Sequence, residues 1–148
     1  MFYNGKQGMQ ISKRGGTMSA LTLEQFQQQV SELLLRHRSL LDVMSKYGQS
    51  SASVSRAVSK AVTECGCIEL NARKQDFRSE LDVDQLKLKL DHHIAGHLCE
   101  NCRDVLKAEL GKNMFYMSAL ANLLDIKLDE VIEQESKKCA TLGIFNMT

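Results

Sequence analysis

The chain has 148 residues, of which 43% are hydrophobic and 25% charged, and its net charge is +1. This length fits one domain, and this composition is that of a globular protein rather than a disordered or collagen-like chain. A nearly neutral chain has no basic field for nucleic acid, so a dedicated nucleic-acid-binding role is disfavoured. No stretch approaches the roughly 20 apolar residues that span a membrane, so we expect no membrane partner.

The composition also predicts the fold class. The chain contains no proline and no tryptophan, and only 5% of its residues are aromatic. β-sandwiches and barrels depend on Gly/Pro turns and on aromatic strand pairs, whereas helices joined by short loops need neither. We therefore predict an all-α protein, a helical bundle of about four main helices.

The N-terminal segment differs from the rest of the chain. Residues 1–18 contain four glycines and no apolar periodicity, which predicts a disordered tail before a single helical domain over residues 19–148. Residues 13–17, Lys-Arg-Gly-Gly-Thr, can be back-translated to a purine-rich AGGAGG ribosome-binding sequence just before Met18. Our hypothesis is that Met18 is the true start of translation.

Helix signals begin directly after this tail. Thr22 and Gln25 form a capping-box pattern, which predicts a first helix to about Arg38. The serine-rich residues 49–53 are typical of a loop and helix cap, so a second helix is expected from Val54 to about Ile68, with apolar residues at helical spacing.

The second half of the chain predicts two more helices. Residues 71–84 are polar and without period, so they are expected to form the main loop, followed by a shorter apolar segment over 86–94. Apolar residues recur from Glu100 to Leu124, which indicates a long and deeply buried helix. A final helix is expected to end near Gly143 as its C-terminal cap.

One short pattern occurs twice: Glu64 precedes Gly66 by two residues, and Glu109 precedes Gly111 by two residues. Glycine inside a helix costs about 1 kcal/mol relative to alanine. A close approach of two helix backbones at these glycines would compensate, and it would point both carboxylates into one space. Paired carboxylates with water and phosphate oxygens are what Mg²⁺ prefers.

Two stretches that carry this pattern resemble a known family. AELGKNMFYMSALANLLDIKLDEVIE (residues 108–133) and TECGCI (63–68) resemble the MazG-like, all-α nucleoside triphosphate pyrophosphohydrolases. The resemblance implies a homo-oligomer, a dimer or tetramer, that cleaves a nucleoside triphosphate to monophosphate and pyrophosphate. In that activity Glu64 and Glu109 match the acids that hold the catalytic magnesium.

The family motif is only half present, which leaves its activity open. Thr63, Cys67 and Lys112 stand where the family has further acids. The resemblance thus indicates a nucleotide-handling protein, either a divergent magnesium-dependent hydrolase or a relative that binds nucleotide without cleaving it. Lys112 is a candidate for direct contact with phosphate.

The five cysteines give a second hypothesis. Cys65, Cys67, Cys99 and Cys102 form CxC and CxxC pairs, and four thiolates make a closed zinc site. Residues two apart lie on nearly opposite sides of a helix, so Cys65 and Cys67 can share a metal only if the helix breaks at Gly66. An intact helix would favour the MazG-like fold, and a broken helix would favour zinc.

Other uses of the cysteines stay open at this point. His97 could replace one cysteine ligand, Cys99 and Cys102 could form a reversible redox pair, or the thiols could simply be buried. Cys139 is expected in the core, and His92 and His93 in solvent. An odd number of cysteines without a signal peptide predicts a cytoplasmic protein. The alternative function is therefore a non-enzymatic helical protein with a zinc or redox site.

Overall fold

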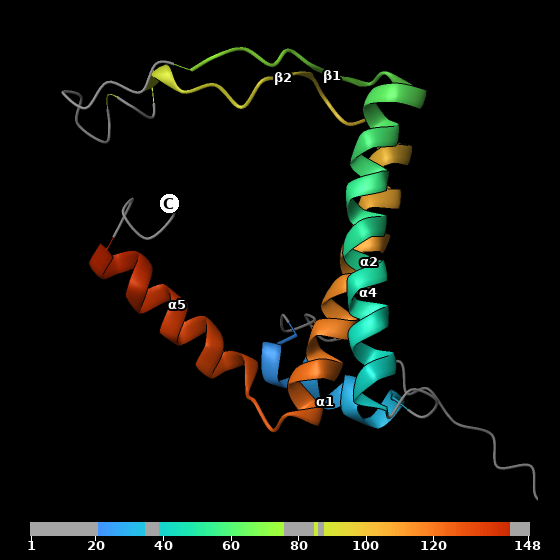
Figure 1. Ribbon diagram of the computed structural model, residues 1–148, viewed down its shortest axis with the longest axis vertical. Helices are drawn as coiled ribbons and strands as arrows, with labels where there is room; N and C mark the ends of the chain where they lie inside the picture. Colours follow the sequence, from blue (N-terminus) through green and yellow to red (C-terminus); the bar gives the residue numbers. More distant parts are fainter. Residues whose placement is uncertain (1–20, 35–38, 76–84, 86–87, 143–148) are drawn as a thin grey trace, which may run out of the picture.

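The computed structural model describes residues 21–34, 39–75, 85 and 88–142. Within these ranges the chain is mostly helical, which confirms the all-α prediction. The helices and strands are labelled in Figure 1, apart from one π-helical turn, η1, that directly follows α2. In chain order they are α1 (Leu23–Leu33), α2 (Leu40–Lys60), η1 (Ala61–Cys65), β1 (Ile68–Leu70), β2 (Ile94–Gly96), α4 (Glu100–Leu123) and α5 (Leu128–Leu142).

Helix α1 begins as the sequence predicts. The Thr22 hydroxyl accepts a hydrogen bond from the backbone N–H of Gln25, and the Gln25 side chain accepts one from the backbone N–H of Thr22. This capping box satisfies two N–H groups that the helix itself leaves unpaired. The helix ends at Leu33, earlier than the expected Arg38, which lies outside the described residues.

Helix α2 corrects the prediction of a serine-rich loop. It runs without interruption through residues 49–53. The hydroxyls of Ser51 and Ser55 donate to the backbone carbonyls of Tyr47 and Ser51, each four residues earlier. Serine side chains that bond within the helix in this way need no loop conformation, so the serine run was a misleading signal.

The long helices α2 and α4 lie side by side and antiparallel (Figure 1). Near their middle, the Asn113 side chain donates hydrogen bonds to the hydroxyls of Ser50 and Ser51, at 3.1 and 2.8 Å. The predicted helix 100–124 is confirmed, but the expectation of deep burial was wrong. Several of its apolar side chains are exposed to solvent: Val105, Leu110 and Met114.

The hydrophobic core lies at one end of this pair, where α1 packs against α4. Its fully or nearly buried members come from three helices and the residue that follows α1: Val30, Leu34, Val43 and Ala119, flanked by Phe26, Phe115 and Leu120. The opposite end of the pair has no comparable cluster in the described part of the chain. Of the residues that the structure describes at that end, only Ala61 and Ile68 are both apolar and buried.

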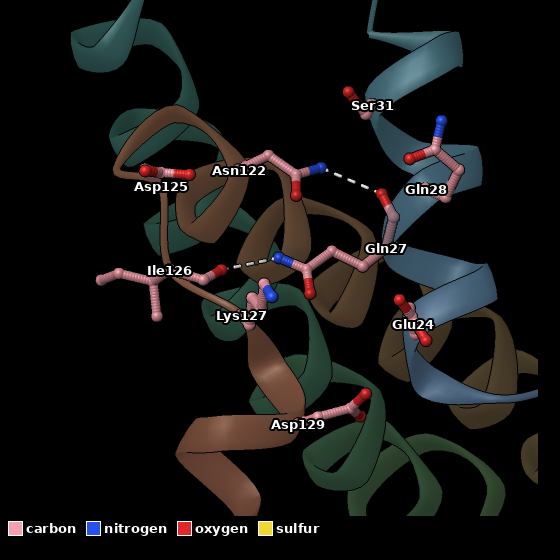
Figure 2. Close-up of a pocket in the computed structure, with 9 residues that line it drawn as sticks. All are labelled: Glu24, Gln27, Gln28, Ser31, Asn122, Asp125, Ile126, Lys127 and Asp129. Carbon is pink, nitrogen blue, oxygen red and sulfur yellow. Dashed lines mark hydrogen bonds between the residues drawn. The ribbon is translucent and has the colours of Figure 1, made fainter.

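A glutamine of α1 fixes the turn between α4 and α5 (Figure 2). The Gln27 side-chain amide donates to the carbonyl of Ile126 at 2.7 Å, and its oxygen accepts from the N–H of Leu128 at 2.9 Å. The Asn122 side chain donates to the Gln27 carbonyl at 3.0 Å. These three bonds hold the start of α5 against α1.

The two strands form an antiparallel hairpin that the sequence did not predict. Ile68 pairs with Gly96 and Leu70 with Ile94. Its spacing had placed Ile68 on the second helix, and that prediction was wrong, because Ile68 lies in β1. Residues 71–75 are neither helix nor strand, in agreement with the predicted loop, whose remainder falls outside the described residues.

Some predictions concern parts of the chain that the structure does not describe. The tail over residues 1–18, the start at Met18 and the cap at Gly143 all belong to this group. Among the described helices, none combines the length and the apolar character required to cross a membrane.

Candidate metal centre

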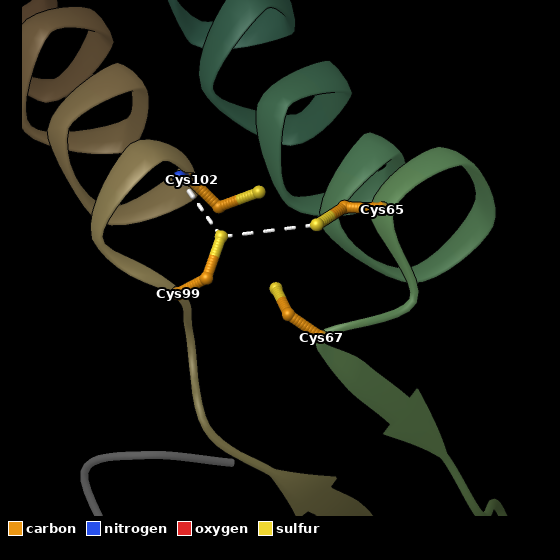
Figure 3. A group of neighbouring side chains, drawn as sticks. All are labelled: Cys65, Cys67, Cys99 and Cys102. Carbon is orange, nitrogen blue, oxygen red and sulfur yellow. Dashed lines mark hydrogen bonds between the residues drawn. The ribbon is translucent and has the colours of Figure 1, made fainter.

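Four cysteine side chains meet at the end of the α2–α4 pair that lacks a core (Figure 3). They come from two segments: Cys65 ends η1 and Cys67 precedes β1, whereas Cys99 precedes α4 and Cys102 lies in its first turn. Their four Sγ atoms all lie within 4.8 Å of one another. The structure thus brings together the CxC and CxxC pairs and places them where they could hold a metal ion.

The CxC pair reaches a common centre because the helix breaks between its two cysteines. The last turn of the helix widens into the π-helix η1, and Gly66 then takes a left-handed conformation with φ +69°. Glycine adopts this conformation without the steric cost that a side chain would add. A break at Gly66 is the condition under which Cys65 and Cys67 can share a metal, and the structure fulfils that condition.

The CxxC pair is arranged by the N-terminus of α4. Cys99 is the N-cap residue, and its sulfur accepts a hydrogen bond from the backbone N–H of Cys102 at 3.4 Å. The Sγ atoms of Cys65 and Cys99 are 3.7 Å apart. The positive end of the helix dipole and this N–H both favour negative charge on sulfur.

The thiols of the cluster differ strongly in acidity. The hydrogen bond from the Cys102 backbone, together with those from neighbouring thiols, lowers the pKa of Cys99 to about 7. The side-chain hydrogen bond between Cys102 and Cys99 raises the pKa of Cys102 to about 12. Charge in the metal-free cluster is therefore concentrated on Cys99. Close packing of thiols disfavours several thiolates at once unless a cation is present.

Gly96 is a residue of this site that the sequence did not reveal. It has φ +81°, and a Cβ built on it would lie 2.7 Å from the backbone oxygen of Cys67. Glycine is therefore required for β2 to approach the chain that carries Cys67. The signal was hidden because neither strand has the length or alternation that predicts a β-hairpin.

The two carboxylates of the magnesium hypothesis are not brought together. Glu64 lies at the cysteine end and pairs with Lys60 at 3.0 Å. Glu109 lies ten residues beyond Cys99 along α4 and pairs with Lys112 at 2.8 Å. At 1.5 Å per residue those ten residues correspond to about 15 Å along the helix.

The glycines that suggested this pairing have other roles. Gly66 ends a helix instead of lying within one, and Gly111 lies within α4 with open space where a Cβ would be. A Cβ on Gly66 would also meet no atom within 4 Å. The expected close approach of two helix backbones at these glycines was therefore wrong.

The remaining candidate ligands lie apart from the sulfur cluster. Among the described residues, the group that could hold a metal ion consists of the four cysteines. It does not include His92, His93 or His97. His92 and His97 are exposed to solvent, and His93 is half-buried. Cys139 is exposed on α5, which corrects its expected place in the core.

Comparisons with protein families, curated proteins and solved structures found no match to this chain. The function of the protein must therefore be inferred from the geometry of the site itself.

Proposed function

We propose that this protein is a non-enzymatic helical protein in which Cys65, Cys67, Cys99 and Cys102 hold one structural zinc ion. The observation that supports this most directly is the distance between the sulfur atoms. Zinc–thiolate bonds of about 2.3 Å place the corners of a tetrahedron about 3.8 Å apart. The Sγ atoms of Cys65 and Cys99 are 3.7 Å apart, and all four lie within 4.8 Å of one another.

The ligand set favours a single soft ion. Thiolates bind zinc in preference to magnesium, which requires oxygen ligands. A site with four protein ligands has no open position for water or substrate, so it stabilises structure rather than catalysing a reaction. The proposed ion links the end of η1 to the start of α4, where Ala61 and Ile68 are the buried apolar residues.

Elemental analysis of the purified chain tests this proposal. We expect about one zinc ion per chain, and loss of most of that zinc in the variant Cys99→Ser, because a tetrahedral site with three thiolates binds zinc more weakly. The matched control is Cys139→Ser, which removes an exposed thiol outside the cluster and should leave the zinc content unchanged. Zinc absent from the reduced wild-type chain, or retained in full by Cys99→Ser, would contradict the proposal.

One observation supports the nucleotide-handling hypothesis as a second candidate. Glu109 and Lys112 line a small cavity of about 230 Å³, together with Lys46 and Tyr116. Although Lys112 is paired with Glu109, the two lysines exceed this one carboxylate in charge, and a net positive charge beside a cavity suits a phosphate ligand. We infer that any nucleotide bound by this chain has its phosphates there, near Lys112.

Pyrophosphate release from nucleoside triphosphates in the presence of magnesium tests this second candidate. If the MazG-like activity exists, Glu109→Gln should lower the rate by about tenfold or more, because a carboxylate that binds the metal would be lost. Glu130→Gln is the control, since Glu130 is exposed on α5. Equal rates in the wild type and in Glu109→Gln would remove Glu109 from the mechanism.

A further inference from the structure

The four thiols of the cysteine cluster are not equally open to solvent. Cys65 is exposed, whereas Cys67, Cys99 and Cys102 are half-buried. Gly66 follows Cys65 without a side chain, and a Cβ built there would meet no atom within 4 Å, so the space beside Cys65 is open. Oxidation of a cysteine depends on its exposure. A small oxidant that diffuses to the cluster therefore meets the Cys65 sulfur first.

Cys65 also has a sulfur neighbour from the other segment of the cluster. Its Sγ atom lies 3.7 Å from that of Cys99, and Figure 3 shows the two sulfur atoms facing each other. An S–S bond is about 2.05 Å long, so the two atoms need to approach by about 1.7 Å. The Cys67 thiol instead donates a hydrogen bond to the Ala61 carbonyl of its own segment, at 3.8 Å.

Cys99 is also better placed than Cys102 to bond with Cys65. Cys99 is the N-cap of α4 and has an extended backbone, with φ −64° and ψ 163°. Cys102 lies in the first turn of α4, so its backbone is fixed by the helix. An N-cap residue stands half outside the helix, and its side chain can shift with little disturbance of the helical hydrogen bonds.

We propose that Cys65 is a site of oxidation by hydrogen peroxide, and that this oxidation forms a Cys65–Cys99 disulfide and releases the zinc ion. This regulation of the site rests on the zinc proposal above. In the first step the Cys65 sulfur attacks the peroxide O–O bond, which leaves a sulfenic acid on Cys65 and releases hydroxide. The Cys99 sulfur then attacks the Cys65 sulfur, and the sulfenic oxygen leaves as a second hydroxide.

The balance of electrons and protons explains why zinc leaves. The two thiolates that form the disulfide lose two electrons, and the peroxide gains them. Protons from solvent convert both hydroxides to water and protonate Cys67 and Cys102, because two sulfurs do not complete a tetrahedral site. The disulfide still links the end of η1 to the start of α4. We therefore expect the oxidised chain to stay folded and to bind zinc again after reduction.

Stepwise addition of hydrogen peroxide to the reduced, zinc-loaded chain tests the proposal, with zinc measured by a chromogenic chelator. We expect about one zinc ion to be released for each chain that loses two thiols. Trypsin digestion without reductant then locates the disulfide, because Cys65 lies in the peptide over 61–73 and Cys99 in the peptide over 90–103. The two peptides should be joined, and a thiol reductant should separate them.

Two double variants identify the partner of Cys65. Cys67→Ser with Cys102→Ser keeps Cys65 and Cys99, whereas Cys67→Ser with Cys99→Ser keeps Cys65 and Cys102. Both variants lack two zinc ligands, so they are compared without metal. We expect the first variant to join its two peptides about tenfold faster than the second, because disulfide formation depends on which sulfur is within reach. Fragmentation of the joined wild-type peptides gives the same assignment without a variant.

The outcomes separate this inference from the zinc proposal. A reduced chain without zinc would contradict the zinc proposal, and the joined peptides would still show whether Cys65 and Cys99 form a disulfide. A chain that holds zinc but keeps it after oxidation would overturn this inference alone. A disulfide between Cys99 and Cys102, within one peptide, would do the same. Cys139→Ser removes an exposed thiol outside the cluster and should change neither zinc release nor the joined peptides.

Discussion

Removal of zinc is expected to lower the midpoint of thermal unfolding by about 10 °C. A ligand present at 1,000 times its dissociation constant stabilises the folded state by about 4 kcal/mol. Structural zinc sites bind tightly enough to reach that regime at low free zinc. For a chain of about 150 residues, each kcal/mol changes the midpoint by about 2–4 °C. Differential scanning calorimetry before and after dialysis against a chelator measures the shift.

The physical reason for so large an effect is the uneven distribution of the core. Val30, Val43 and Ala119 hold the α1 end of the helix pair without help from the cysteines. At the other end, the proposed zinc ion takes the place of an apolar core. Hydrogen exchange should therefore increase first in η1 and the hairpin when zinc is removed.

Two controls separate a specific zinc effect from damage by the chelator. Re-addition of zinc to the metal-free protein should restore the original midpoint, whereas magnesium should not, since four thiolates are poor ligands for it. The variant Cys139→Ser should show the same loss and recovery as the wild type. An unchanged midpoint after complete removal of zinc would mean that the cysteine cluster carries no structural metal.

The fold class could be predicted from sequence because its signals are local. The Thr22 capping box and the apolar period over 100–124 each depend on residues that are close together in the sequence, and both agree with the structure. The absence of proline from the whole chain agrees with it as well. The serine run was misleading because serine favours both loops and helix-internal hydrogen bonds to the preceding turn. Only the tertiary contacts of α2, such as Ser50 with Asn113, resolve that ambiguity.

The candidate site was predictable in its residues but not in its geometry. The CxC and CxxC spacings identify the four cysteines, yet whether they meet depends on the backbone at Gly66, which the sequence leaves free to be helical or left-handed. The same freedom explains the wrong expectation of a close helix contact at Gly66 and Gly111. A glycine in a helical pattern is equally consistent with a close helix contact, a helix end and plain open space.

Gly96→Ala is expected to destabilise the protein by about 2–5 kcal/mol. The left-handed conformation costs a residue with a side chain roughly 1–2 kcal/mol, and overpacking typically adds about 1–3 kcal/mol. Overpacking applies here because the new Cβ would lie 2.7 Å from the Cys67 oxygen. Both the hairpin and the Cys67 backbone must then shift. Urea unfolding of the zinc-loaded chain measures the loss of stability.

Gly111→Ala is the matched control, and the sign of its effect should be opposite. Gly111 lies within α4 with nothing within 4 Å of a built Cβ, so alanine should stabilise the helix by about 1 kcal/mol. A competition assay with a chromogenic chelator distinguishes the two sites further. Gly96→Ala should weaken zinc binding by about tenfold or more, which corresponds to about 1.4 kcal/mol, because it displaces the chain that carries Cys67. Gly111→Ala should leave zinc affinity unchanged. Equal stability changes in the two variants would mean that β2 does not approach Cys67 as closely as the structure places it.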